Sequence, residues 1–188
     1  MAELALEDVV FMSRPSARLA EIEFEKLVKQ NQAKIVRLAM GMLRDPDLAQ
    51  DVAQETFVRA FRFYKTFRND SAFFTWLYRI AVNLCLDAHR KARIRATEPI
   101  DVCDEGSEPE DPAPGPERMT EMRELAKHVD VALDTLSPNH KAILILRESE
   151  GLSYEELSRV LRIPKGTVMS RLFHARMKLQ RECARLAG

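Results

Sequence analysis

Cysteine and glycine are scarce in this sequence. The 188 residues contain six glycines and three cysteines, at positions 85, 103 and 183, with no C-x-x-C pair. An odd and widely spaced set of cysteines indicates neither a disulfide framework nor a zinc site. We expect Cys85 to lie in a hydrophobic core, and Cys103 and Cys183 to have no particular role.

Long hydrophobic runs are missing as well. No stretch approaches the ~20 apolar residues that cross a bilayer. The acidic residues 1–8 lack the basic and then apolar order of a signal peptide. We therefore expect a cytosolic protein. The hydrophobic fraction of 46% is still enough for one domain or two small ones.

The sequence also lacks motifs for catalysis and cofactor binding. Its four histidines stand far apart with no H-x-x-x-H pair, and there is neither a Walker glycine loop nor a G-x-S-x-G motif. The adjacent carboxylates Glu155 and Glu156 are explained by a helix start. We therefore expect no enzymatic activity, no metal and no cofactor.

Charge, in contrast, is gathered in blocks. The formal net charge is zero, yet residues 59–97 carry nine Lys and Arg against two Asp and Glu, and residues 159–188 carry eight against one. Such blocks raise the local potential where phosphates dock, so the neutral total does not exclude a nucleic-acid partner. The alternative is that each block is only a solvated surface.

An acidic segment separates the two basic blocks. Residues 98–117 contain eight carboxylates, no cation, five prolines and two glycines. They have too few apolar groups to form a core, so we predict a flexible linker at 97–117. Fully stretched, about 20 residues reach roughly 65 Å, which lets the flanking parts occupy separate sites on one DNA duplex.

The last third of the chain has the pattern of a helix-turn-helix. Ser153 and Glu156 form a capping box that predicts a helix start. The buried side of this helix is predicted to carry Leu157, Val160 and Leu161. Pro164 stops it, and a second helix is predicted from about Lys165. The inward face of the second helix has apolar residues at three- and four-residue spacing, Val168, Leu172 and Ala175.

The opposite face of this second helix is polar and basic. It carries Ser170, Arg171, His174 and Lys178. Such groups can reach base edges in a DNA groove, while the helix start and flanking cations hold phosphates. The plainer alternative is an amphipathic helical hairpin with a solvated basic face.

Residues 21–64 have a helical pattern in two parts. The first helix is predicted over about 21–43, with an apolar face of Phe24, Leu27, Val28, Ile35, Leu38, Ala39 and Met42. Asp45 followed by Pro46 signals a restart. The second helix, about 46–64, is predicted to turn several residues toward other helices: Val52, Ala53, Thr56, Phe57, Ala60 and Phe61.

A third helix is predicted from a cap at Asp70 or Ser71 to about Arg93. Two apolar stripes are predicted to face the core, Phe73, Leu77, Ile80 and Leu84 beside Phe74, Tyr78, Ala81 and Cys85. The remaining face carries Trp76, Arg79, Asn83, Asp87 and Arg90. Aromatic, amide and guanidinium groups on one helix edge suit separated DNA strands. A core position for Trp76 is an equally good interpretation.

Four blocks in this order resemble a known family. They are residues 24–28, 51–61 and 74–83, together with the helix-turn-helix. They resemble the bacterial RNA polymerase sigma factors of the extracytoplasmic-function (ECF) group, over about residues 21–96 and 120–183. The resemblance implies an all-α fold: two small helical domains joined by an acidic Pro-rich linker, the C-terminal one a helix-turn-helix.

The resemblance also implies a domain organisation and an activity. Residues 1–20 would be an N-terminal extension, 21–96 the second sigma domain, 97–117 the linker and 118–188 the fourth sigma domain. The protein would bind core RNA polymerase, direct it to specific promoters, and support promoter melting and transcription initiation. The middle domain of larger sigma factors is absent.

Roles for individual residues follow from the same resemblance. Contact with core polymerase is assigned to Asp51, Gln54, Glu55 and Phe57. Recognition of the minus-ten element is assigned to Lys65, Arg68, Asn69, Trp76, Arg79, Asn83, Asp87, Arg90 and Lys91. Recognition of the minus-thirty-five element is assigned to Lys165, Gly166, Thr167, Ser170, Arg171, Phe173, His174, Arg176 and Lys178. Many relatives carry a basic residue where this chain has Met169 or His174, which bears on the base preference.

The implied partners are core RNA polymerase, promoter DNA and an anti-sigma factor, which is often bound to the membrane in this family. A rival hypothesis is a conventional helix-turn-helix transcription regulator that acts without stable polymerase association. Stoichiometric co-purification with core polymerase distinguishes the two.

Overall fold

The computed structural model describes residues 17–64, 73–95 and 127–187, and all regular elements in these ranges are helices. Three long helices come first, α1 (Ala17–Leu43), α2 (Pro46–Tyr64) and α3 (Phe73–Arg95). A helical segment at 127–134 precedes α5 (Pro138–Leu144), the π-helical turn η1 (Ile145–Ser149), α6 (Tyr154–Leu161) and α7 (Lys165–Ala187). The predicted all-α class is therefore confirmed. Among the described helices, none combines the length and the apolar character needed to span a membrane.

The first helix boundaries are close to those predicted. α1 begins at Ala17 rather than near Glu21, and α2 has the predicted bounds. Arg44 ends α1 with a left-handed φ of 61°. Asp45 then caps α2, because its Oδ1 accepts a hydrogen bond of 2.9 Å from the backbone N–H of Leu48. The predicted cap of the third helix, the linker and residues 1–16 of the predicted N-terminal extension lie outside the described residues, while residues 17–20 of that extension belong to α1.

Helices α1, α2 and α3 pack into a first unit. The α1 residues Leu38, Ala39 and Met42 are fully buried, and small residues such as Ala53 and Ala60 let α2 approach closely. Phe24 packs its ring against a cluster of aromatic rings, with centroids 5.2 Å from Phe61, 5.1 Å from Tyr64 and 6.3 Å from Phe73. Cys85 is buried as predicted, and burial raises the pKa of its thiol to about 12.

Two aromatic residues lie less deeply than a core position requires. Phe61 was predicted to face other helices, and this holds only in part: its ring packs against Phe24, but 46% of the residue is exposed. The reason is that it stands at the open edge between α1 and α2. Trp76 is half-buried, with its ring centroid 5.7 Å from that of Phe73. The core interpretation of Trp76 thus holds in part, and its contact with DNA stays a prediction.

The second unit, residues 127–187, contains the predicted helix-turn-helix. The capping box is present: Ser153 Oγ accepts from the Glu156 N–H at 3.2 Å, and Glu156 Oε2 accepts from the Ser153 N–H at 2.8 Å. The helix ends at Arg162, whose φ of 53° is left-handed. The inward positions are buried as predicted, at Leu157, Val160, Val168, Leu172 and Ala175. Leu161 is only half-buried.

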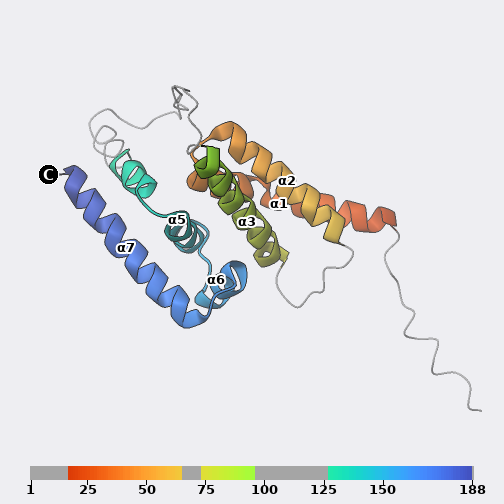
Figure 1. The fold of residues 1–188 in the computed structure, drawn as a ribbon. Coiled ribbons are helices and arrows are strands. Elements are labelled where there is room, and N and C mark those ends of the chain that lie inside the picture. The colour runs from red at the N-terminus through yellow and green to blue at the C-terminus, as the bar shows by residue number, and fades with distance from the viewer. Residues whose placement is uncertain (1–16, 65–72, 96–126, 188) are drawn as a thin grey trace, which may run out of the picture.

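The two units pack directly against each other (Figure 1), with α3 against α6 and with α1 and α3 against α5. The backbone of α1 comes close to η1 at Gly41, where an added Cβ would lie 3.0 Å from Cδ1 of Ile145. Arg44 also crosses the boundary, with Nη2 at 2.8 Å from Asp130 Oδ1 and Nε at 3.3 Å from Asp134 Oδ1. The sequence did not predict this closed arrangement.

Candidate nucleic-acid interface

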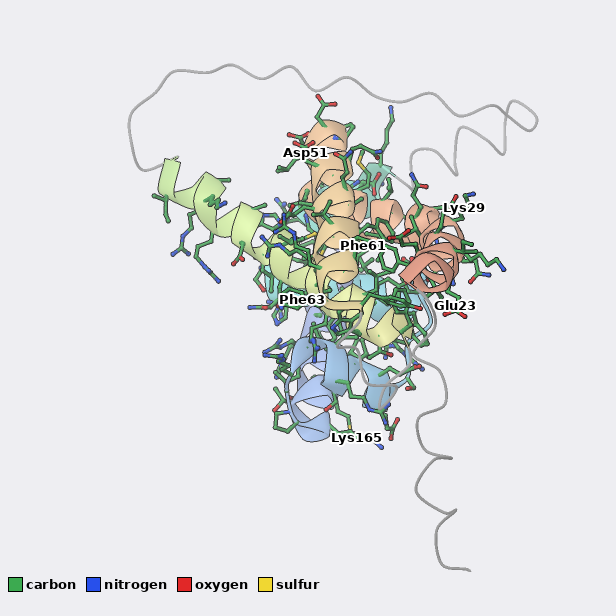
Figure 2. The ribbon with its side chains drawn as sticks, turned by 90° about the vertical axis from the view of Figure 1, so that its right-hand side faces the viewer. Glu23, Lys29, Asp51, Phe61, Phe63 and Lys165 are labelled. Atoms are coloured by element: carbon green, nitrogen blue, oxygen red, sulfur yellow. The ribbon has the colours of Figure 1, made fainter. Side chains whose placement is uncertain are left out.

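The face of α7 opposite its buried residues is exposed. Ser170, Phe173 and His174 lie there, and 61% of Phe173 is exposed. The rings of Phe173 and His174 are 5.5 Å apart. A hydroxyl, an imidazole and an apolar ring are groups that can contact base edges and thymine methyls in a major groove. Figure 2 shows that Lys165, which begins α7, lies at the opposite end of the molecule from Asp51.

The basic side chains around this face are held by nearby acceptors. The ammonium group of Lys165 pairs with the carboxylate of Glu155. Arg176 Nη2 lies 2.6 Å from Glu148 Oε1, and this hydrogen bond raises the pKa of Arg176. Lys178 Nζ donates to the Thr135 carbonyl at 2.8 Å. Exposed ion pairs contribute little free energy, so Lys165 and Arg176 can exchange a carboxylate for a DNA phosphate, and Lys178 can exchange its carbonyl acceptor for one.

Arg171 stands on the flank of α7 that faces α5, and it is half-buried. It acts on His140, whose pKa is lowered by burial and then by the positive charges of Arg171, Lys178 and His174. If the exposed face of α7 enters a DNA groove, this flank lies nearer to the sugar-phosphate backbone of the DNA than to the base edges. At the start of α7, Gly166 is exposed and Thr167 is half-buried.

The residues predicted to read the minus-ten element fall into two groups. Asn83, Arg90 and Lys91 are exposed along α3, and Asp87 pairs with Arg90 at 3.0 Å. A separate pair, Trp76 and Arg79, lies one to two turns from the described start of α3 and lines a cleft against α6. The three remaining candidates, Lys65, Arg68 and Asn69, lie outside the described residues.

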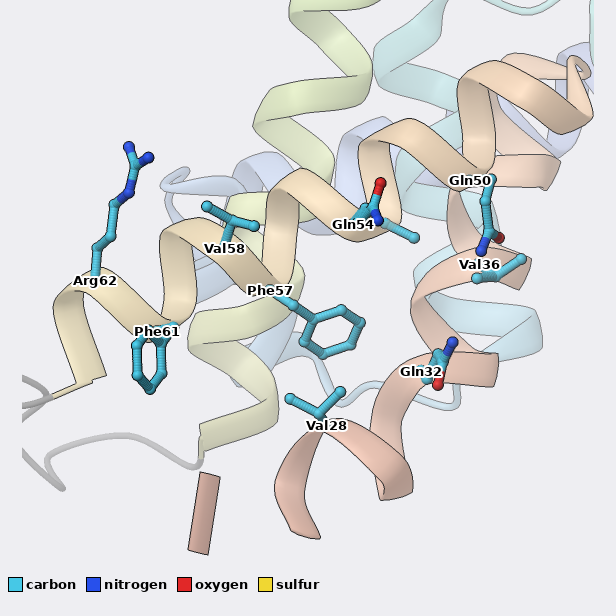
Figure 3. Close-up of a pocket in the computed structure, with 10 residues that line it drawn as sticks. Val28, Gln32, Val36, Gln50, Gln54, Phe57, Val58, Phe61 and Arg62 are labelled. Carbon is cyan, nitrogen blue, oxygen red and sulfur yellow. The ribbon is translucent and has the colours of Figure 1, made fainter. Parts of the chain in front are cut away.

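The residues predicted to bind polymerase divide between two grooves on α2. Gln54 and Phe57 line an open groove of about 460 Å³ against α1, where Phe57 and Val28 point toward one another (Figure 3). Asp51 and Glu55 line a second groove of about 360 Å³ against α3. The first groove is mostly apolar and the second carries charges of both signs. The four residues thus lie along one helix but line two different grooves.

Sequence reasoning missed a buried carboxylate between the two units. The Glu150 side chain is only 3% exposed. It accepts a hydrogen bond of 2.5 Å from the Tyr78 hydroxyl of α3 and one of 3.1 Å from Arg37 Nε of α1. Burial, followed by this bond to Glu150, raises the pKa of Tyr78 well above its usual range. No local pattern marks Glu150, because both of its partners are distant in sequence.

Comparison with known proteins identifies the family. The family model for sigma-70 region 2 matches residues 27–94, and the model for sigma-70 region 4 matches residues 128–179. The chain is 43% identical over 159 residues to the RNA polymerase sigma-H factor of Pseudomonas aeruginosa, covering 81% of this chain and 82% of that one. It is 36% identical over 163 residues to the ECF RNA polymerase sigma-E factor of Haemophilus influenzae, covering 84% and 85%. The chain belongs to the ECF group of RNA polymerase sigma factors.

As an ECF sigma factor, this protein directs RNA polymerase to promoters for transcription initiation. The region 2 match spans most of α1, α2 and α3, which a regulator built only around a helix-turn-helix would not need, so the rival hypothesis is not favoured. Two solved structures share the fold. The sigma factor RpoE from Bartonella quintana, in complex with the anti-sigma factor NepR, aligns with a TM-score of 0.68 at 22% identity over 85% of this chain and 96% of that one. CnrH in complex with the cytosolic domain of CnrY aligns with a TM-score of 0.62 at 24% identity over 87% and 91%.

Proposed function

We propose how this sigma factor divides its contacts among polymerase, DNA and a regulator. The division follows two domains, 21–96 and 118–188, joined by the linker 97–117. The first binds core polymerase and the minus-ten element, and the second binds the minus-thirty-five element. The observation that carries the proposal is the exposed face of α7, which is opposite a fully packed inner face and so has no structural role within the described chain.

On α7, Ser170, Phe173 and His174 contact base edges, while Lys165, Arg176 and Lys178 hold phosphates. Arg171 contacts the backbone from its flank, with Gly166 and Thr167 at the helix start. Cations near a helix N-terminus suit phosphate, and groups at the centre of the exposed face suit bases. The choice of promoter sequence then depends mainly on Ser170, Phe173 and His174.

On α3, Asn83 contacts separated strands, and Arg90 and Lys91 contact phosphates. Asp87 orients Arg90 through their ion pair of 3.0 Å. Trp76 and Arg79 face α6 in the closed arrangement, so they reach DNA only after the two units separate. We propose that Lys65, Arg68 and Asn69 belong to the same DNA-contacting region.

On α2, we propose that polymerase occupies both grooves, so that Gln54 and Phe57 contact one part of it and Asp51 and Glu55 another. An anti-sigma factor is proposed as a further partner, because the fold is shared with RpoE, whose solved structure is a complex with an anti-sigma factor. We further propose a partner anchored in the membrane. The complex of CnrH with a cytosolic domain of CnrY supports this form of control.

The polymerase proposal is tested by replacing Asp51, Gln54 and Glu55 together with alanine. The matched control replaces three exposed polar residues of α1 that line neither groove, Glu23, Lys26 and Gln30. Far-ultraviolet circular dichroism checks that both variants fold. In gel filtration with core polymerase, we expect the α2 variant to lose at least tenfold in affinity and the control to co-elute normally. Equal co-elution of the two variants would refute the assignment.

A further inference from the structure

A cleft at the junction of the two units is lined by three arginines. Its volume is about 270 Å³, and its lining residues come from α3 and from the end of α6: Thr75, Trp76, Arg79, Ser158, Arg159 and Arg162. None of the ion pairs formed among the described residues includes any of the three arginines. The carboxylate of Glu155 pairs with Lys165, and it attracts Arg159 more weakly from outside the cleft lining.

The half-buried Arg79 and the exposed Arg162 repel each other across this cleft. Burial, and then the positive charge of Arg162, lower the pKa of Arg79. The backbone of Arg162 is left-handed at the end of α6. Like charges brought together in a partly desolvated site disfavour that arrangement unless an anion neutralises them. The packing of α3 on α6 therefore leaves a positive site open.

Thr75 supplies a second and independent observation. The residue is 3% exposed, it lines the same cleft, and its Oγ1 has no hydrogen-bond partner in the part of the chain that the structure describes. The other buried threonine, Thr56 of α2, instead donates its hydroxyl to the Val52 carbonyl at 2.7 Å. A buried hydroxyl without a partner costs free energy that a ligand oxygen can recover. The cleft thus offers both charge and a vacant hydrogen-bond donor.

We propose that this cleft binds the phosphoryl group of a small phosphorylated anion. Arginine forks match the spacing of phosphate oxygens, and a tetrahedral dianion can accept from several guanidinium groups and from a hydroxyl at once. At ~30 Å³ per water in the liquid, the cleft corresponds to about nine waters, which leaves room for a phosphate or diphosphate group. The ligand contacts both units, since Thr75 and Arg79 belong to α3 and Arg159 and Arg162 to α6.

Such a ligand stabilises the closed arrangement by mass action, because the complete site exists only while α3 and α6 are packed together. The bound ligand keeps α3 packed against α6 and so opposes the contact of α3 with promoter DNA. This consequence rests on the proposed function. Binding itself does not rest on it.

The test uses the single tryptophan of the chain, Trp76, which lines the cleft. The full-length protein is titrated with sodium phosphate and sodium pyrophosphate, and separately with sodium chloride at matched ionic strength. We expect a saturable change in tryptophan fluorescence and a rise in melting temperature with the phosphoryl anions only. A response that follows ionic strength regardless of the anion overturns the proposal.

Three variants sharpen the result. Arg162→Asn removes a cleft cation, and asparagine tolerates the left-handed backbone better than arginine, so the fold should be kept. It should weaken binding at least tenfold, which corresponds to about 1.4 kcal/mol. Thr75→Val should raise the melting temperature without anion and also weaken binding. Arg181→Gln removes an exposed α7 cation outside the cleft and should change neither. Equal affinity in Arg162→Asn and Arg181→Gln overturns the proposal.

The source of the phosphate is tested by adding a short single-stranded oligonucleotide of random sequence. If it alone saturates the signal while phosphate and pyrophosphate do not, the cleft is a DNA-backbone contact and the small-anion proposal is wrong. None of these binding measurements involves polymerase, so their outcome is independent of the co-elution experiment on α2.

Discussion

The hydrogen bond between Tyr78 and Glu150 is expected to hold the two units together. Glu150 comes from the second unit and Tyr78 from the first, and the Glu150 side chain is 3% exposed. A hydrogen bond to a charged acceptor is worth about 1.5 to 3 kcal/mol, and the low exposure favours the upper part of this range. We therefore expect Tyr78→Phe to lower the free energy of unfolding by about 2.5 kcal/mol.

Urea denaturation of the full chain measures this change, and a double-mutant cycle with Glu150→Gln isolates the pair. We expect a coupling of at least about 1 kcal/mol between the two substitutions. Arg37→Gln should cost less, below about 1 kcal/mol, because 57% of the Arg37 side chain is exposed and solvent screens its charge.

Tyr64→Phe is the matched control. The Tyr64 hydroxyl makes no hydrogen bond to another part of the described chain, and the residue lies in the first unit alone. Its loss should change the unfolding free energy by less than about 0.5 kcal/mol. A Tyr78→Phe effect no larger than that of Tyr64→Phe, or a coupling to Glu150 near zero, would show that this contact does not stabilise the closed arrangement.

Two further predictions concern a histidine and a glycine. The pKa of His140 is lowered in the folded state by burial and nearby cations, so the stability it contributes is complete above its unfolded pKa of about 6.5 and is lost as pH falls through the lower folded value. Melting temperature should therefore fall below about pH 6.5, and His140→Gln should flatten that fall; an unchanged slope would contradict the assignment. Gly41→Ala should favour α1 locally but crowd the Ile145 side chain, because the new Cβ would lie 3.0 Å from Ile145 Cδ1. Urea denaturation should show a lower unfolding free energy for Gly41→Ala, and the addition of Ile145→Val, which removes Cδ1, should reduce that loss; an unchanged unfolding free energy in Gly41→Ala would contradict this.

The helices could be predicted from the sequence because their signals are local. The capping box at Ser153 and the stop at Pro164 act within one turn of the chain, and Val168, Leu172 and Ala175 share a face by periodicity alone. The same holds for the restart at Asp45. Each of these predictions needed only neighbours within four residues.

The contacts between the units could not be predicted, because they join residues 70 to 115 positions apart. Glu150 lies between η1 and α6 and resembles any exposed loop carboxylate, yet its partners are Tyr78 and Arg37. The division of the α2 site residues has a similar cause: Gln54 and Glu55 are adjacent in sequence, but they line grooves formed with different helices. The sequence predicted a more buried Phe61 than the structure shows. Periodicity indicates which way a side chain points, but not how much of it the neighbouring helix covers.

Arg44 both ends α1 and links the two units. Its left-handed backbone terminates α1, a conformation in which glycine would be less strained, while its guanidinium spans to Asp130 and Asp134 in the second unit. Replacement by glycine would relax the helix end and at the same time release the second unit. A glycine at this position would therefore favour the folding of the first unit but weaken its packing against the second unit. Selection for a more stable first unit would by itself yield a more open sigma factor.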